Sequence, residues 1–183
     1  MKKKQITIKE YKNIPGTHTI IIENARYQEN FFDVIEKLLN YFLIDKEVFF
    51  GFNRIDGINL TQEQVKKLEK EIPIFFKKNG DIQKLNEYLT VARINSNDYN
   101  YNFIPSIFDY YLDTIMFNPN IDWESFKQYH INYQEHTLED IIINHFSEIL
   151  FYYFDSGDLQ ICFNPQIYNP KDVRNIINLF FEE

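Results

Sequence analysis

The stretch that decides the fold is FYYFDSGDLQICF, residues 151–163. Two short apolar runs, 151–154 and 159–163, flank the polar sequence DSGD at 155–158. Apolar runs joined by four turn-forming residues that include a glycine are typical of a β-hairpin. We therefore expect an antiparallel sheet with this hairpin near its carboxy-terminal end.

The amino-terminal segment predicts a second hairpin. Residues 4–11 alternate apolar and polar, NIPG at 13–16 supplies a turn, and 18–23 is the returning strand. An amphipathic helix is expected over 29–42 from the spacing of its apolar residues. A last helix is expected to begin at Asn169-Pro170, an N-cap followed by proline at the first helical position.

The rest of the chain predicts further strands and helices. Together they predict an α+β fold, with a mainly antiparallel sheet of about six strands and about five packed helices. One domain over residues 1–183 is expected, with the polar segment 95–102 as the place of any subdivision. The further strands are expected at 47–53, 89–94 and 113–118, and the further helices at 61–71, at 82–88, after Asp122 and at 137–149.

Charge is divided unevenly along the chain. Residues 1–97 hold sixteen Lys and Arg against thirteen Asp and Glu, whereas 98–183 hold three against fourteen. The formal net charge of the whole chain is −8. An asymmetry of this size carries information about partners rather than about the fold.

Composition also bounds the compartment and the source. Cys162 is the one cysteine, which excludes an intrachain disulfide and favours a reducing environment. No run of 18 apolar residues is present, so we expect no membrane span and a cytoplasmic location. Scarce alanine with abundant Ile, Asn, Lys, Phe and Tyr fits an AT-rich genome, and a bacterial or phage source is the natural hypothesis.

Catalytic motifs are weak throughout. The strongest candidate is the region from Glu135 to His145, which includes His136 and has His130 close by, for a small hydrolase that could use a metal. Its spacing matches no compact ligand pattern, because Asp140 and His145 are five residues apart. No phosphate-binding glycine loop or nucleophile elbow is present, and we expect neither a cofactor nor a bound metal.

A weak internal repeat stands in the acidic half. IMFNPNI at 115–121 matches ICFNPQI at 161–167 at five of seven positions. One interpretation is a duplicated recognition unit. The other, which we favour, is that Asn and Pro recur because they end strands and begin helices.

Partner chemistry follows from the acidic half, whose carboxylates are scattered among aromatic residues rather than gathered in a tail. Charge steers protein association and aromatic side chains supply binding energy. With a sequence pI near 5.1, direct nucleic-acid binding is not expected. We expect a non-catalytic inhibitor of the toxin-immunity, antitoxin or phage-inhibitor type, which occludes a basic site on another protein. The candidate contact residues are Asp109, Asp113, Trp123, Glu124, Glu135, Glu139, Asp155 and Asp158.

Overall fold

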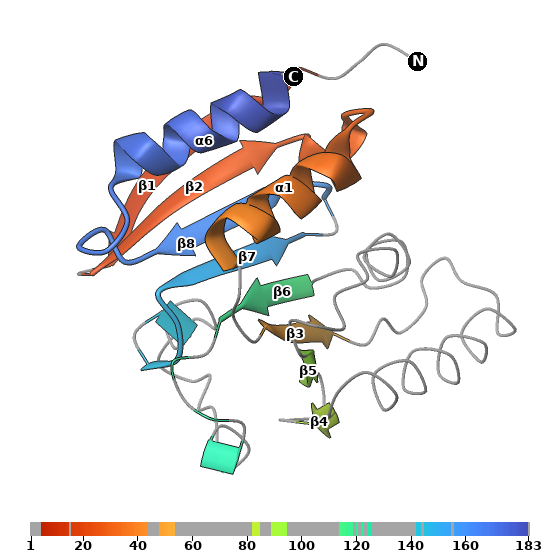
Figure 1. Cartoon of the computed structure of the whole chain (residues 1–183). Helices are drawn as coiled ribbons and strands as arrows, with labels where there is room; N and C mark the ends of the chain where they lie inside the picture. The colour runs from red at the N-terminus through yellow and green to blue at the C-terminus, as the bar shows by residue number, and fades with distance from the viewer. Residues whose placement is uncertain are drawn as a thin grey trace, which may run out of the picture.

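The described part of the chain forms one antiparallel sheet with two long helices packed on one of its faces (Figure 1). This computed structural model describes residues 5–14, 16–43, 48–53, 82–84, 89–94, 114–118, 120, 122, 124–125, 142–143, 145–154 and 156–182. The sheet has eight strands in the order β1-β2-β8-β7-β6-β3-β5-β4, and every neighbouring pair is antiparallel. The first and last hairpins of the chain are therefore adjacent, through the pairing of β2 with β8.

The element bounds follow the sequence patterns closely at both ends of the chain. Both predicted hairpins form, and both terminal helices lie where their apolar spacing placed them. The elements are β1 (Thr7–Ile14), β2 (Thr17–Glu23), the short 3-10 helix η1 (Ala25–Tyr27), α1 (Phe31–Leu43), β3 (Val48–Asn53), β4 (Ile82–Lys84), β5 (Leu89–Ile94), β6 (Thr114–Phe117), β7 (Ile149–Tyr153), β8 (Leu159–Phe163) and α6 (Pro170–Glu182).

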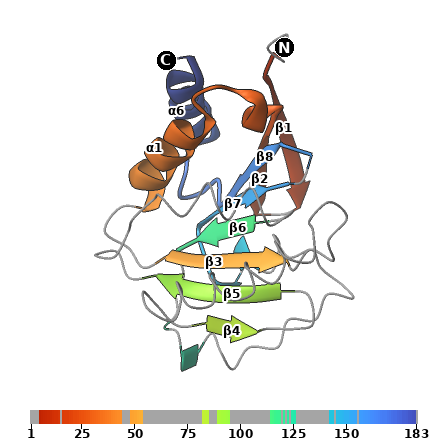
Figure 2. The ribbon, with the colours of Figure 1, turned by 90° about the vertical axis from the view of Figure 1, so that its right-hand side faces the viewer.

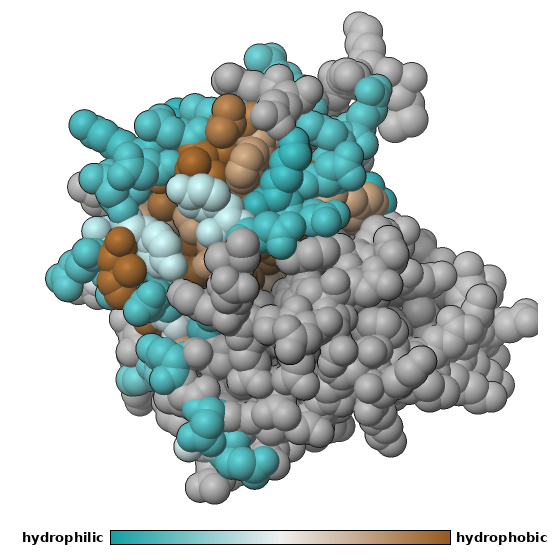
Figure 3. Space-filling model, viewed as in Figure 1, coloured by the Kyte–Doolittle hydropathy of each residue, from teal (hydrophilic) through white to brown (hydrophobic). Residues whose placement is uncertain are grey.

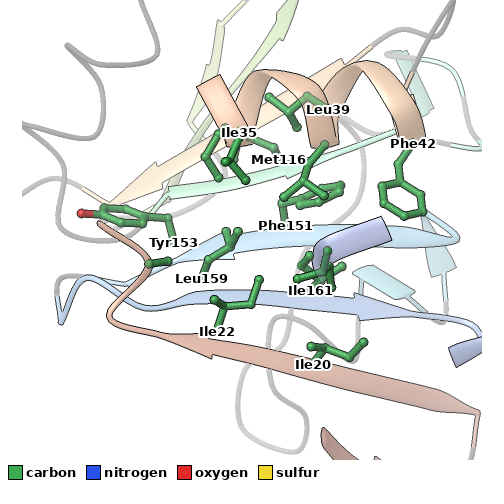
Figure 4. Close-up of a cluster of buried hydrophobic side chains, with 14 of the residues drawn as sticks. Ile20, Ile22, Ile35, Leu39, Phe42, Met116, Phe151, Tyr153, Leu159 and Ile161 are labelled. Atoms are coloured by element: carbon green, nitrogen blue, oxygen red, sulfur yellow. The ribbon is translucent and has the colours of Figure 1, made fainter. Parts of the chain in front are cut away.

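The main core lies between the sheet and the two helices. Strand register places Ile20, Ile161, Phe151 and Met116 side by side across four strands, and all four are fully buried. Figure 4 shows this row beneath the α1 side chains, including Phe42. Because an α-helix repeats every 3.6 residues, α1 presents one continuous apolar stripe to the sheet. That stripe comprises Phe31, Val34, Ile35, Leu38, Leu39, Phe42 and Leu43.

The opposite face of the central strands is also buried. Thr19, Cys162, Leu150 and Phe117 form the neighbouring row, and none of them is more than 2% exposed. Cys162 belongs to this row, where its sulfur accepts hydrogen bonds from the Thr19 hydroxyl at 3.5 Å and the Gln160 amide at 2.9 Å. The thiol is therefore a buried, hydrogen-bonded part of the fold.

The expected element counts are wrong. The sheet has eight strands rather than about six, and the described residues hold two long helices rather than about five. The segment expected as a helix at 82–88 contributes β4, an edge strand on β5, because strand pairing overrides a weak local helix pattern. Residue 149, expected within the helix 137–149, instead begins β7. The expected helix at 61–71 and the subdivision at 95–102 lie outside the described residues.

Figure 2 shows how the helices and strands are distributed in space. Both helices lie over the half of the sheet that contains β1, β2, β8 and β7. Strands β3, β5 and β4 extend the sheet away from them. The two helices thus stand next to each other, although one is near the start of the chain and the other ends it.

Candidate functional site

A groove opens between the end of α1 and the beginning of α6. Its volume is about 380 Å³, which falls in the range of about 300–1,000 Å³ typical of ligand pockets. Figure 3 shows hydrophobic residues, in brown, reaching the surface among hydrophilic ones in the part of the molecule that holds the two helices. We call this site the α1–α6 groove; its lining residues are Tyr41, Phe42, Ile167, Tyr168, Asn169, Asp172, Val173 and Ile176.

The connection from β8 to α6 builds one wall of the groove. The Asn164 carbonyl accepts hydrogen bonds from the backbone N–H groups of Ile167 and Tyr168, at 3.1 and 3.0 Å. The Asn164 side chain accepts another from the Gln166 N–H at 2.9 Å, which closes an Asx turn. This fixed turn leaves Ile167 50% exposed while Tyr168 is partly buried.

Aromatic rings form the floor and the opposite wall. Phe42 is buried and meets Tyr168 edge to face, with ring centroids 5.8 Å apart. Tyr41 packs edge to face on Phe42 at 4.9 Å and contacts Phe180 of α6 at 6.3 Å, yet remains 55% exposed. Tyr41 therefore spans from α1 to α6 at the mouth of the groove. Such a half-exposed, packed tyrosine resembles the rigid aromatic anchors of protein interfaces.

Electrostatics of the groove are acidic. Asp172, in the first turn of α6, is the one charged residue among the described residues that line it. Burial, and secondly the negative charge of Glu148, raise the pKa of Tyr168 above its ordinary value. The Tyr168 hydroxyl is therefore protonated and neutral at physiological pH. The groove thus combines neutral aromatic surface with negative charge.

Of the eight residues predicted to contact a partner, two lie within the described residues. Glu124 is exposed, at the start of a helical turn that Asp122 caps through the Ser125 N–H at 2.9 Å. Asp158 is half-buried and accepts a hydrogen bond from the backbone N–H of Asn24 at 2.9 Å, which gives it a structural role. Six others lie outside the described residues: Asp109, Asp113, Trp123, Glu135, Glu139 and Asp155.

The region considered for hydrolysis is described only at its end. His145 is exposed, and its ring lies 6.2 Å from that of Phe146. His130, His136 and residues 135–140 lie outside the described part. Within the described residues, no three His, Cys, Asp or Glu side chains are placed to hold a metal ion together.

A histidine–carboxylate–arginine cluster joins β1, β2 and α6. Glu10 accepts a hydrogen bond from the Arg174 guanidinium at 2.6 Å, and its other oxygen lies 3.6 Å from Nε2 of His18. His18 is only 4% exposed and packs against Phe163, with ring centroids 5.2 Å apart. A substrate has no access to such an imidazole, so this cluster ties α6 to the first hairpin instead of forming a catalytic site.

Register separates the two copies of the internal repeat. They end β6 and β8, which flank β7 on either side. Phe117 in the first copy stands in the row of Cys162, whereas the equivalent Phe163 stands beside Ile149 on the helix-covered face. Equivalent side chains therefore point to opposite faces of the sheet. This arrangement favours the interpretation that Asn and Pro recur because they end strands.

Sequence patterns did not single out the α1–α6 groove. A usable signal was Tyr41, a large aromatic residue outside the apolar rhythm of its helix. No family model, curated protein or solved structure matches the chain. In the described part of the chain no helix has the length and apolar character needed to cross a membrane.

Proposed function

We propose that this protein is a non-catalytic binding protein that neutralises a basic partner protein by covering its functional surface. The cytoplasm is the proposed site of action, and toxin immunity, antitoxin action or phage-type inhibition are its proposed settings. The observation that carries the proposal is the α1–α6 groove. It exposes Tyr41 and Ile167 beside Asp172, and the described residues that line it include no lysine or arginine.

Interface physics supports this assignment. Aromatic and aliphatic side chains that are packed at their base and open at their tip provide most of the binding energy in protein complexes. Tyr41 has this arrangement through its contacts with Phe42 and Phe180. The formal net charge of −8 favours association with a positively charged protein and raises its encounter rate.

The test starts with the immobilised full-length chain and a lysate of its source organism. A captured protein is identified, purified, and titrated against the chain by calorimetry at several salt concentrations. We expect a basic partner whose activity is inhibited and whose affinity falls as salt rises. Tyr41→Ala should weaken binding by about tenfold or more, because interface anchors contribute about 1.4 kcal/mol or more each.

Tyr11→Ala is the matched control. Tyr11 is 40% exposed and stands beside Thr19, on the face of the sheet opposite α1 and α6. Its loss should change the affinity by less than about twofold, as expected outside a hot spot. A captured partner that is acidic, or one whose affinity ignores both salt and Tyr41, refutes the proposal.

A further inference from the structure

The charge of the α1–α6 groove selects a cation. Asp172 lines the groove, and the negative charge of Glu148 contributes, after burial, to the raised pKa of Tyr168. Among the described residues, no lysine or arginine forms an ion pair with Asp172. A carboxylate beside neutral aromatic surface is favourable for a positively charged group and unfavourable for an anion.

The beginning of α6 is closed to anions for a second reason. A helix N-terminus binds anions through its unpaired N–H groups. Here the Asn169 side chain accepts the Lys171 N–H at 2.9 Å, and the Asn169 carbonyl accepts the N–H groups of Asp172 and Val173, both at 3.0 Å. Pro170 has no N–H to offer. The donors of the first turn are therefore already used.

Aromatic lining narrows the choice among cations. Guanidinium is planar, stacks on aromatic faces and forms paired hydrogen bonds with carboxylates, which an ammonium group does less well. The chain already contains this packing, since the Arg26 guanidinium lies 4.6 Å from the centroid of the Phe32 ring. The groove presents Tyr41 and Tyr168 next to Asp172. Its volume of about 380 Å³ has room for one long side chain.

We propose that the α1–α6 groove binds an arginine side chain of the partner protein, with its guanidinium on Asp172 and against the ring of Tyr168, and its aliphatic stem along Tyr41 and Ile167. This inference rests on the proposed function for the identity of the partner. The binding chemistry itself belongs to the groove and is testable without the partner.

The experiment titrates the isotope-labelled full-length chain with Nα-acetyl-arginine amide and follows backbone and aromatic NMR signals. The uncharged, nearly isosteric probe is Nα-acetyl-citrulline amide. We expect saturable shifts at Tyr41, Ile167 and Tyr168, and about tenfold weaker binding of the citrulline probe. Asp172→Asn should weaken arginine binding by about fivefold, the upper value for a partly exposed ion pair.

Asp33→Asn is a close control, because Asp33 is an exposed acid in the first turn of α1, as Asp172 is in α6. It should leave arginine binding unchanged. Equal binding of arginine and citrulline, equal binding of Nα-acetyl-lysine amide, preference for Nα-acetyl-glutamate amide, or no saturable shift in the groove each overturns the inference. Dimerisation that buries Tyr41 also overturns it, since a second copy would then be the occupant.

The two proposals fail separately. If the arginine probe does not bind but Tyr41→Ala weakens a basic partner, the protein-binding function stands and the arginine assignment falls. If the probe binds with the stated dependence on Asp172 but no basic protein is neutralised, the groove assignment stands and the function falls.

Discussion

Replacement of Gly157 tests how the β7–β8 hairpin is anchored. Gly157 has φ +89°, a backbone conformation that side chains of L-residues disfavour. Its carbonyl accepts the Arg26 N–H at 2.9 Å, so the turn lies directly against η1. A Cβ at this position would stand 3.1 Å from Cε2 of Tyr27 and 3.2 Å from Cβ of Arg26.

Gly157→Ala therefore combines two costs. A non-glycine residue at positive φ costs about 1–2 kcal/mol, and overpacking adds about 1–3 kcal/mol. We expect the free energy of unfolding to fall by about 2–5 kcal/mol. Gly16→Ala provides the comparison, because Gly16 also has positive φ, at +103°, but lies exposed in the β1–β2 hairpin. Its expected loss is the conformational cost alone, about 1–2 kcal/mol.

Urea unfolding followed by far-ultraviolet circular dichroism measures both variants. The denaturant slope should be unchanged, so that midpoints report stability. If Gly157→Ala lowers the free energy of unfolding no more than Gly16→Ala does, the close approach of the turn to η1 adds nothing to the effect of the substitution, and the reasoning is refuted.

Three further predictions concern the core, a predicted contact residue and an ionisable groove residue. Phe151→Ala should lower the free energy of unfolding by about 3–5 kcal/mol, because Phe151 is fully buried, and a loss below about 1 kcal/mol in urea unfolding would contradict its place in the core. Asp158→Ala should lower the free energy of unfolding by about 1 kcal/mol, because it removes the acceptor of the Asn24 N–H, and should leave partner affinity measured by calorimetry unchanged. Weaker affinity with unchanged stability would instead indicate that Asp158 contacts the partner. Because the pKa of Tyr168 is raised in the folded protein, its contribution to stability is complete below about pH 10 and is lost as pH rises further. From about pH 9 to about pH 11, the urea midpoint of Tyr168→Phe should therefore fall less steeply than that of the unmodified protein. Parallel curves would exclude this contribution.

Local sequence patterns were sufficient to predict the two hairpins and α1, whose structure is specified by residues that are close together in the chain. The first hairpin was predicted from alternation and a turn sequence, and the last from two apolar runs that flank turn residues. Helix α1 was predicted from one uninterrupted apolar stripe. The strand β4 was missed because it holds only three residues and exists through its pairing with β5. The strand order itself has no local signal, since β2 pairs with β8 at the far end of the chain.

The candidate site depends on that same long-range pairing. Tyr41 lies near the end of α1 and Ile167 lies just before α6, and they meet because the first and last hairpins are neighbours in the sheet. Neither segment contains a sequence pattern that predicts its proximity to the other. The roles of the acids were only partly visible in the sequence. Asp122 was expected at the start of a helix and does cap a helical turn, whereas the hydrogen bond from the Asn24 N–H to Asp158 joins residues far apart in the chain and has no local signal.

The sheet order also changes the meaning of the uneven charge. Strands β1 and β2 come from the basic half of the chain, yet they lie beside β8 and β7 from the acidic half. Helix α1 likewise packs beside α6. In this part of the molecule the two halves are therefore interleaved rather than opposed, and an acidic half is not by itself an acidic surface. The α1–α6 groove lies at their junction, where the basic half provides Tyr41 and Phe42 and the acidic half provides Tyr168 and Asp172. The proposed recognition of a basic partner at this junction uses residues of both halves, so Tyr41→Ala and Asp172→Asn are both expected to weaken binding of the same arginine.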